Sequence, residues 1–272
     1  MGITISQSEF ENLRDFIYDN YGINLNNKQV LVEGRLGNFV ENRGFSSLTQ
    51  YFDFVQNERN GSEIKRLLER ITTNFTYFMR EKAHYDFLTE KALPKFTKTI
   101  ADKDLRIWSA GCSSGEEPYT TAIVLSEFFG AGRRAWDTTV LATDISDNML
   151  NIARRGVYEA DKLDRLPTEW RSRYFSDLKD GTFRVSEDLR KQVVFNTFNL
   201  MTRALPFKKK LHVIFCRNVM IYFDKPTKEA LINRFYDALE PGGYVFIGLS
   251  ETMTGIQTKF QYIQPSIYTK GG

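Results

Sequence analysis

The chain has 272 residues, of which 42% are hydrophobic and 14% aromatic, enough to build one large domain and a smaller one. A net charge of +3 is too slight to predict a nucleic-acid-binding surface, and we find neither a signal segment nor an apolar run that could span a membrane. With only two cysteines, Cys112 and Cys216, and two histidines, we expect a cytoplasmic protein without disulfides or a metal site.

The N-terminal part of the chain is predicted to be helical. Apolar residues recur at helical spacing in four segments, and a glycine follows two of them, as is typical of helix C-termini. The segments are 8–21, 28–43, 47–57 and 62–71. We expect an N-terminal helical domain over residues 1–75 and a second, larger domain over residues 76–272.

From residue 105 onward, short apolar runs rich in β-forming residues alternate with helical segments. The runs are 105–110, 138–143, 193–198, 211–216 and 244–248. This alternation predicts an α/β fold with a mostly parallel sheet and helices on both faces. Residues 157–192 break the pattern, and the turn signal Lys179-Asp-Gly181 predicts a small antiparallel β insertion there.

The segment Leu105-Arg-Ile-Trp-Ser-Ala-Gly-Cys-Ser-Ser-Gly-Glu-Glu-Pro-Tyr119 runs from a strand through a Gly-rich turn into a helix. Gly111 lets the backbone turn sharply and approach a ligand closely. The acids Glu116 and Glu117 in the first helical turn argue against a phosphate ligand, and neither dinucleotide nor triphosphate glycine spacing is present. A nucleoside that carries an amine and a sulfonium fits better, so we predict S-adenosylmethionine as the cofactor.

Two acids are candidates to hold that cofactor. Asp144 ends a predicted strand where nucleotide-binding folds place an acid on the ribose hydroxyls. It could instead cap the next helix, but Ser146 and Asp147 lie closer to that helix and can cap it, so the ribose role is favoured. Glu117 could bind the amino-acid moiety of the cofactor or only complement the helix dipole, and position alone leaves both open.

Polar residues also follow two later strands. Asn199 and Leu200 come after strand 193–198, where Asn199 could contact the adenine edge, although a turn-forming asparagine explains it nearly as well. Arg217, Asn218 and Tyr222 come after strand 211–216 and are predicted to lie near the reacting centre.

The predicted interdomain linker contains Asn74, Thr76 and Arg80. Helix capping could account for Asn74 and Thr76, but it leaves Arg80 unexplained.

Four segments resemble one known family. They are Thr72-Thr-Asn-Phe-Thr-Tyr-Phe-Met-Arg80, Trp108-Ser-Ala-Gly-Cys-Ser-Ser-Gly-Glu-Glu-Pro-Tyr119, Ala142-Thr-Asp-Ile-Ser146 and Cys216-Arg-Asn-Val-Met-Ile-Tyr-Phe223. The chain resembles the CheR-type chemotaxis receptor methyltransferases, which esterify glutamates of chemoreceptors, over nearly its whole length. The resemblance implies a Rossmann-like methyltransferase sheet with an N-terminal helical domain and a small β insertion.

The resemblance also implies residue roles. The cofactor-binding positions of the family correspond here to Asn74, Thr76, Arg80, Gly111, Glu117, Asp144, Asn199, Leu200, Arg217 and Asn218. Arg80 and Tyr222 fall near the methyl-transfer centre. The N-terminal helices of the family help to hold the acidic methylation region of the receptor, a role that Lys28, Arg35 and Arg43 would have here.

The expected partner is therefore the cytoplasmic domain of a methyl-accepting chemoreceptor, bound by a monomer. A glutamate carboxylate is already ionised near neutral pH, so its methylation needs no general base, and the scarcity of histidines is no obstacle. Two rival readings are a nucleic-acid methyltransferase and a module that senses S-adenosylmethionine without turnover. Cys216-Arg-Asn-Val219 in place of an Asn/Asp-Pro-Pro-aromatic motif disfavours the first, and the presence of Arg80 and Tyr222 disfavours the second.

Overall fold

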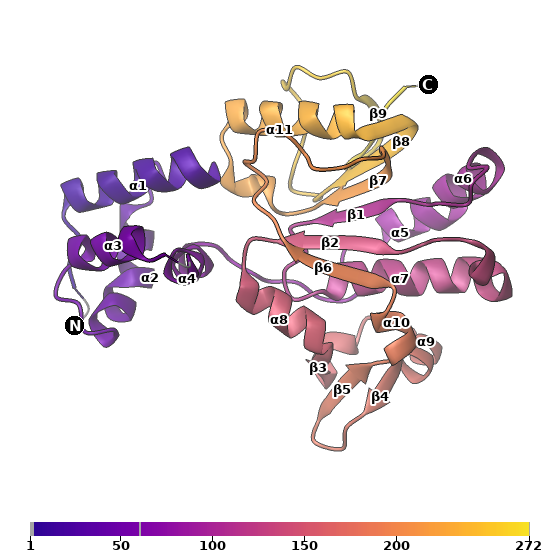
Figure 1. Ribbon diagram of the computed structural model, residues 1–272, viewed down its shortest axis with the longest axis horizontal. Helices are drawn as coiled ribbons and strands as arrows, with labels where there is room; N and C mark the ends of the chain where they lie inside the picture. Colours follow the sequence, from indigo (N-terminus) through magenta and orange to yellow (C-terminus); the bar gives the residue numbers. More distant parts are fainter. Residues whose placement is uncertain (1–2, 60, 272) are drawn as a thin grey trace.

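The computed structural model describes residues 3–59 and 61–271. The chain forms a helical domain that projects from one end of an α/β domain (Figure 1). The helical domain contains α1 (Gln7–Tyr21), α2 (Gln29–Asn42), α3 (Leu48–Asn57) and α4 (Ser62–Ile71), close to the four predicted segments. A capping box between Ser6 and Glu9 begins α1, and Gly22 in the left-handed conformation ends it.

The α/β domain is built on a seven-stranded sheet of order β6-β2-β1-β7-β8-β10-β9. Its strands are β1 (Ile107–Ala110), β2 (Val140–Asp144), β6 (Val193–Thr197), β7 (Leu211–Cys216), β8 (Leu239–Ile247), β9 (Gln261–Gln264) and β10 (Ile267–Thr269). The first five are parallel, whereas β10 is antiparallel to both of its neighbours. The five predicted strands are therefore present, and the antiparallel pair at the sheet edge was not predicted.

Side chains alternate between the two faces of the sheet, and each face has its own core. Trp108 and Ile214 belong to a core that runs from the helical domain to α11 (Lys225–Ala238). Ile107 and Phe215 point to the opposite core. That second core includes α5 (Ala83–Phe87), the π-helical turn Leu88–Ala92, α6 (Leu93–Thr99), α7 (Glu116–Phe129), α8 (Asp147–Arg155) and α10 (Glu187–Arg190). The helical domain thus shares a hydrophobic core with one face of the sheet.

The predicted β insertion is a three-stranded antiparallel sheet of order β3-β5-β4. It comprises β3 (Val157–Glu159), α9 (Thr168–Tyr174), β4 (Phe175–Asp177) and β5 (Thr182–Val185), and it lies beyond α8 in Figure 1. Phe78 joins it to the α/β domain through edge-on contacts with the rings of Tyr158 and Phe175.

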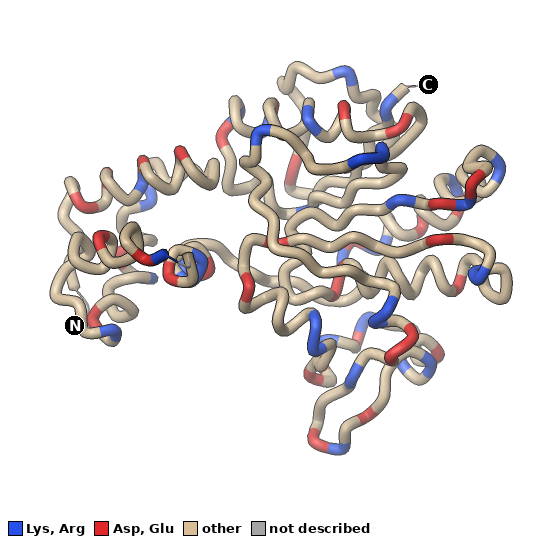
Figure 2. Tube along the Cα trace, in the orientation of Figure 1, with Lys and Arg blue, Asp and Glu red and all other residues tan. Residues whose placement is uncertain are grey.

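Acidic and basic residues are intermingled over both domains (Figure 2). Among the described residues, no helix is long and apolar enough to cross a membrane. The same residues include no group of three or more metal-binding side chains that could hold an ion.

Candidate functional site

A cavity of about 360 Å³ lies at the carboxyl ends of β1, β2, β6 and β7, where the strand order of the sheet reverses. This is the edge at which open α/β sheets bind their ligands. Every residue predicted to contact the cofactor or the transferred methyl group lines it. These are Asn74, Thr76, Arg80, Gly111, Glu117, Asp144, Asn199, Leu200, Arg217, Asn218 and Tyr222.

The Gly-rich turn after β1 lines the cavity through Gly111, Cys112 and Ser113. Gly111 has a φ of +82°, and a Cβ atom there would lie 2.4 Å from Cγ2 of Val219. The N–H groups of Gly111 and Cys112 both donate to the carbonyl of Thr143, which fixes the turn against β2. Glycine is therefore required at this position both by conformation and by space.

Asp144 ends β2 and points its carboxylate at that turn. One carboxylate oxygen accepts from the backbone N–H of Ser113 at 2.8 Å, and the other accepts from that of Ser146 at 2.9 Å. Burial raises the pKa of Asp144, against the opposing effect of these N–H groups. Since a carboxylate offers about four acceptor positions, both oxygens can still accept from ligand hydroxyls. Ser146 itself caps α8, as the sequence indicated.

Glu117 lies inside the cavity wall rather than at the surface of α7. Its carboxylate accepts from the Ser109 hydroxyl at 2.7 Å and from Nη1 of Arg217 at 3.0 Å. Burial raises the pKa of Glu117, and the charge of Arg217 opposes that rise. A carboxylate in this position can hold a ligand ammonium group, which simple complementation of the helix dipole would not require.

Arg217 is 6% exposed and makes contacts mainly with other protein groups. Its Nε donates to Glu81 at 3.1 Å, Nη1 also donates to the Tyr85 hydroxyl at 3.2 Å, and Nη2 donates to the carbonyl of Arg80. The guanidinium thus holds Glu117 and the chain before α5 in place, which makes it an organiser of the cavity wall.

Arg80 stands between two residues with strained backbone. Met79 and Glu81 have φ values of +59° and +57°, in a region that non-glycine residues seldom adopt. One N–H of the Arg80 guanidinium donates to the carbonyl of Phe75 at 2.6 Å, and the group lies 5.8 Å from the Tyr77 ring centroid. The strain is consistent with a segment shaped to direct this cation into the cavity.

Asn218 also has a positive φ, +58°, and its buried Oδ1 has no hydrogen-bond partner among the described residues. An unpaired buried amide oxygen facing a cavity favours a ligand that supplies a donor. The loop that carries Asn218 is held by Glu251, which the sequence analysis missed. Glu251 accepts from the backbone N–H groups of Asn218 at 2.9 Å, Ile221 at 3.1 Å and Gly248 at 2.6 Å.

The Asn199 side chain bridges the two domains. Its Nδ2 donates to the carbonyl of Asn20 in α1, and its Oδ1 accepts from the N–H of Met201. The turn-forming role is therefore present, alongside its place in the cavity lining. Leu200, 9% exposed, supplies apolar wall next to it.

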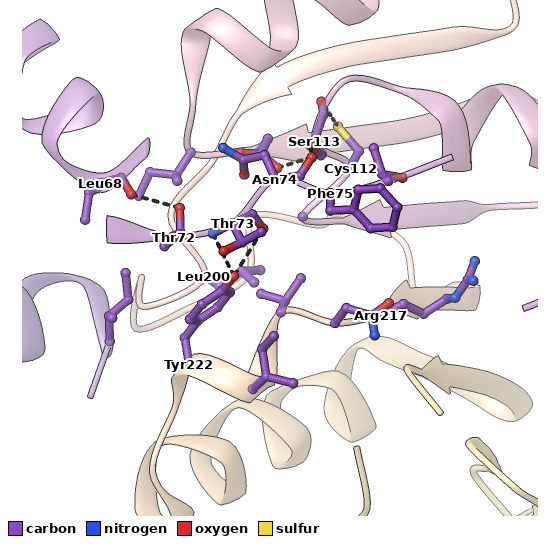
Figure 3. A pocket seen from close by; sticks show the side chains of 18 of the residues that line it. Leu68, Thr72, Thr73, Asn74, Phe75, Cys112, Ser113, Leu200, Arg217 and Tyr222 are labelled. Atoms are coloured by element: carbon purple, nitrogen blue, oxygen red, sulfur yellow. Dashed lines mark hydrogen bonds between the residues drawn. The ribbon is translucent and has the colours of Figure 1, made fainter. Parts of the chain in front are cut away.

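Residues 72–77 form an extended linker that closes one side of the cavity (Figure 3). The capping explanation for Asn74 and Thr76 was wrong, because no helix begins at either residue. The Tyr222 hydroxyl accepts from the N–H of Thr73 at 2.8 Å and donates to its carbonyl at 3.1 Å. Tyr222 therefore fastens the linker to the loop after β7.

The helical domain contributes to the cavity more directly than the sequence indicated. Tyr21, Ile23 and Leu68 line it, and Ile23 pairs with Phe223 in an isolated antiparallel bridge. Periodicity could not reveal this, since these apolar residues read only as core positions of helices.

The three predicted acceptor-binding cations lie outside the cavity lining. Arg43 is paired with the buried carboxylate of Glu63 at 2.5 Å. Arg35 donates to the end of α4 and to the linker. Among the described residues, Lys28 has no side-chain hydrogen bond or ion pair, so of the three it is the one whose charge has no protein partner.

Two cation–ring pairs form a rim beside the cavity near Arg80. Phe75 is 63% exposed, and the ammonium of Lys162 lies 5.8 Å from its ring centroid. The guanidinium of Arg165 lies 4.2 Å from the Tyr77 centroid. Such a rim, defined here as Phe75, Tyr77, Lys162 and Arg165, favours an anionic group at the entrance.

The cavity lining includes two buried carboxylates, those of Asp144 and Glu117, and the unpaired amide oxygen of Asn218, which are groups that can accept hydrogen bonds from a nucleoside with an amino-acid tail. Residues 74–269 match the family described as "CheR methyltransferase, SAM binding domain", and residues 8–72 match "CheR methyltransferase, all-alpha domain". The chain belongs to the CheR methyltransferase family. It is an enzyme that uses S-adenosylmethionine as methyl donor.

The likeness to individual family members extends over nearly the whole chain. A chemotaxis protein methyltransferase of Borreliella burgdorferi is 43% identical over 99% of this chain and 96% of its own length. The chemotaxis protein methyltransferase Cher2 of Pseudomonas putida is 34% identical over 95% of both chains. The chemotaxis protein methyltransferase of Escherichia coli is 31% identical over 98% of this chain and 92% of its own.

Proposed function

We propose that this CheR methyltransferase transfers a methyl group from S-adenosylmethionine to glutamate carboxylates of the cytoplasmic domain of a chemoreceptor. The names of the relatives support the setting of chemotaxis. The observation that carries the proposal is the placement of Arg80 and Tyr222 in one cavity with the predicted cofactor residues. In this proposal the enzyme is a cytoplasmic monomer with no nucleic-acid substrate.

The proposed cofactor contacts follow from the chemistry of each group. Asp144 accepts from the ribose hydroxyls with the acceptor positions that Ser113 and Ser146 leave free. Glu117 binds the ammonium of the amino-acid moiety, and Asn218 Oδ1 accepts from a ligand donor. The remaining proposed contacts, by lining position, are Asn74, Thr76, Arg80, Gly111, Asn199, Leu200 and Arg217.

The proposed chemistry needs a positioned acceptor rather than a base. The cofactor supplies an electrophilic methyl group on a sulfonium, and a glutamate carboxylate is ionised near neutral pH. Arg80 retains N–H groups beyond the one given to Phe75 and orients the acceptor carboxylate. Tyr222 shapes the methyl site and keeps the linker closed against water.

An anionic acceptor also suits the entrance. The rim of Phe75, Tyr77, Lys162 and Arg165 supplies two cations within reach of the cavity mouth. In the division of labour that the resemblance implies, residues 1–75 contact the receptor through Lys28, Arg35 and Arg43, residues 76–272 bind the cofactor, and residues 157–192 form the inserted subdomain. The structure leaves Lys28 as the best supported of those three contacts, since Arg35 and Arg43 already have protein partners.

The proposal is tested by identifying the methylated atom. Purified enzyme and S-adenosylmethionine are incubated in separate reactions with one of three acceptors: a chemoreceptor cytoplasmic domain, duplex DNA or RNA. Mass spectrometry of the digested receptor should show methyl esters on glutamates and none on other residues. Methylated bases, or methyl groups on lysine or arginine, would contradict the acceptor assignment. Cofactor binding without turnover on any acceptor would favour the sensing module.

Single-turnover rates test the two residue roles separately. At saturating cofactor and receptor, Arg80→Ala should slow methyl transfer by removing the group that orients the carboxylate. Tyr222→Phe should slow it by opening the linker and the methyl site. Unchanged rates in both variants would show that neither residue contributes to the transfer step.

A further inference from the structure

Arg35 is turned toward the linker rather than toward an external ligand. It lies on α2, and its Nη1 donates to the carbonyls of Ile71 at 2.6 Å and Thr72 at 3.3 Å. Its Nη2 donates to the hydroxyl of Thr73 at 3.2 Å. One guanidinium therefore holds three consecutive residues that begin at the last residue of α4.

These contacts satisfy groups that the helix leaves unpaired. Ile71 ends α4, and the carbonyls of a final helical turn have no partner within the helix. The neighbouring N–H of Thr72 still donates back to Leu68 at 2.9 Å, after which the chain becomes extended. Arg35 thus sets the direction in which the chain leaves the helical domain.

That direction determines the shape of the cofactor cavity. Thr72 and Thr73 both line the cavity. The backbone N–H and carbonyl of Thr73 form hydrogen bonds with the Tyr222 hydroxyl. In Figure 3, Thr72, Thr73 and Asn74 lie together along the wall, with Tyr222 reaching up to Thr73. The linker at Thr73 is thus held by the helical domain through Arg35 and by the α/β domain through Tyr222.

We propose that Arg35 is a positioning residue for the cofactor cavity: it holds residues 71–73 so that the linker closes on the bound nucleoside, and its loss weakens cofactor binding in the absence of any acceptor. This differs from the acceptor contact that the resemblance assigned to it. The proposed role of Arg35 rests on the cofactor site of the proposed function and not on the identity of the acceptor.

The geometry of the guanidinium makes the proposal testable by a conservative change. A lysine keeps the positive charge but lacks the planar fork that reaches several oxygens at once. If Arg35 served only as a charge for an acidic acceptor, Arg35→Lys would retain much of its function. If it positions the linker, Arg35→Lys should bind cofactor nearly as poorly as Arg35→Ala.

The chain offers a matched control in Arg70, which lies in the last turn of α4. Its guanidinium lies over the Phe39 ring, 4.8 Å from the centroid, and donates no hydrogen bond to the linker among the described residues. Arg70→Ala therefore removes the same charge beside the same helix end without removing the linker contacts.

The experiment is calorimetric titration of the full chain with S-adenosylhomocysteine, without receptor, for wild type, Arg35→Ala, Arg35→Lys and Arg70→Ala. Circular dichroism at the titration temperature confirms that each variant is folded. Loss of the linker contacts should raise the dissociation constant about 10-fold in both Arg35 variants, and Arg70→Ala should bind like wild type.

A double-mutant cycle with Tyr222→Phe gives a second readout. Because both residues act on Thr73, their effects on the dissociation constant should be less than additive. The proposal would be overturned if Arg35→Ala and Arg35→Lys bound S-adenosylhomocysteine with wild-type affinity and only their KM for receptor were raised. Fully additive effects of Arg35→Ala and Tyr222→Phe would also contradict a shared action through the linker. Failure of receptor methylation by the wild-type enzyme would overturn only the acceptor assignment.

Discussion

Nη1 of Arg217 lies 3.0 Å from the Glu117 carboxylate, and the two side chains join the loop after β7 to the first turn of α7. Both are largely buried, with 2% and 12% of their side-chain surfaces exposed. The same guanidinium also pairs with Glu81. A single guanidinium therefore pairs with two acids beside the cofactor cavity.

Removing that cation should be costly. Arg217→Ala leaves Glu117 and Glu81 buried without their partner, so the free energy of unfolding should fall by about 3–5 kcal/mol. Chemical denaturation of the ligand-free enzyme measures this. Arg14→Ala, which removes an exposed pair with Asp15, is the control and should change stability little. A loss in Arg217→Ala as small as that in the control would show that the pair does not organise the wall.

Cofactor binding should depend on pH through Glu117. Burial raises its pKa above the ordinary 4.5 in the ligand-free enzyme, and a bound ammonium group lowers it again. Binding therefore releases protons, and affinity for S-adenosylhomocysteine falls as the pH drops through the raised pKa of Glu117. Titrations across the acidic range should show this fall in wild type and a shallower one in Glu117→Gln. If affinity depended on pH in the same way in wild type and in Glu117→Gln, Glu117 would not be the group that binds the ammonium.

Asp144 should distinguish ligands by their ribose hydroxyls. Each hydrogen bond to a charged acceptor contributes about 1.5–3 kcal/mol, so Asp144→Asn should bind S-adenosylhomocysteine about 10- to 100-fold more weakly. The 2′-deoxy analogue separates ribose contact from damage to the turn at Ser113. Wild type should prefer the ribose form, and Asp144→Asn should lose most of that preference. An undiminished preference in the variant would place the ribose elsewhere.

The turn after β1 should not tolerate a side chain at Gly111. An alanine Cβ would lie 2.4 Å from Val219 and would carry a φ of +82°, so Gly111→Ala should lower stability by about 1–3 kcal/mol and weaken cofactor binding. Gly132→Ala, with open space around it, is the matched control. Thermal denaturation with and without S-adenosylhomocysteine compares them. Equal melting temperatures and equal ligand-induced shifts would contradict a close-packed turn.

Much of the fold followed from local patterns. The four N-terminal helices were predictable because each buries a periodic apolar face, and the five parallel strands because each is a short apolar run. The predicted bounds of α4 and β7 match closely. Strands β9 and β10 were missed because they are short and sit at an antiparallel edge where β9 is largely exposed. Helices α5 and α6 were missed because a π-helical turn between them disturbs the helical period.

The candidate site was predictable where a residue with a recognisable chemical role lies at the end of a predicted strand, as Asp144 and Gly111 do. Glu251 could not be found in this way, since its role depends on three backbone N–H groups brought together only by the fold. Likewise, a positive charge on α2 gave no sign that Arg35 turns inward to carbonyls 36 and 37 residues away. Side chains that hold other segments in place carry no local sequence signal.

The most direct test of the proposed function uses radiolabelled S-adenosylmethionine, the purified enzyme and membranes that contain a chemoreceptor. After transfer, the receptor band is isolated and treated with mild alkali. Release of the label as methanol is the predicted result, since carboxyl methyl esters hydrolyse under these conditions. Label that resists alkali, or no label on the receptor although the enzyme binds the cofactor, would contradict glutamate methylation.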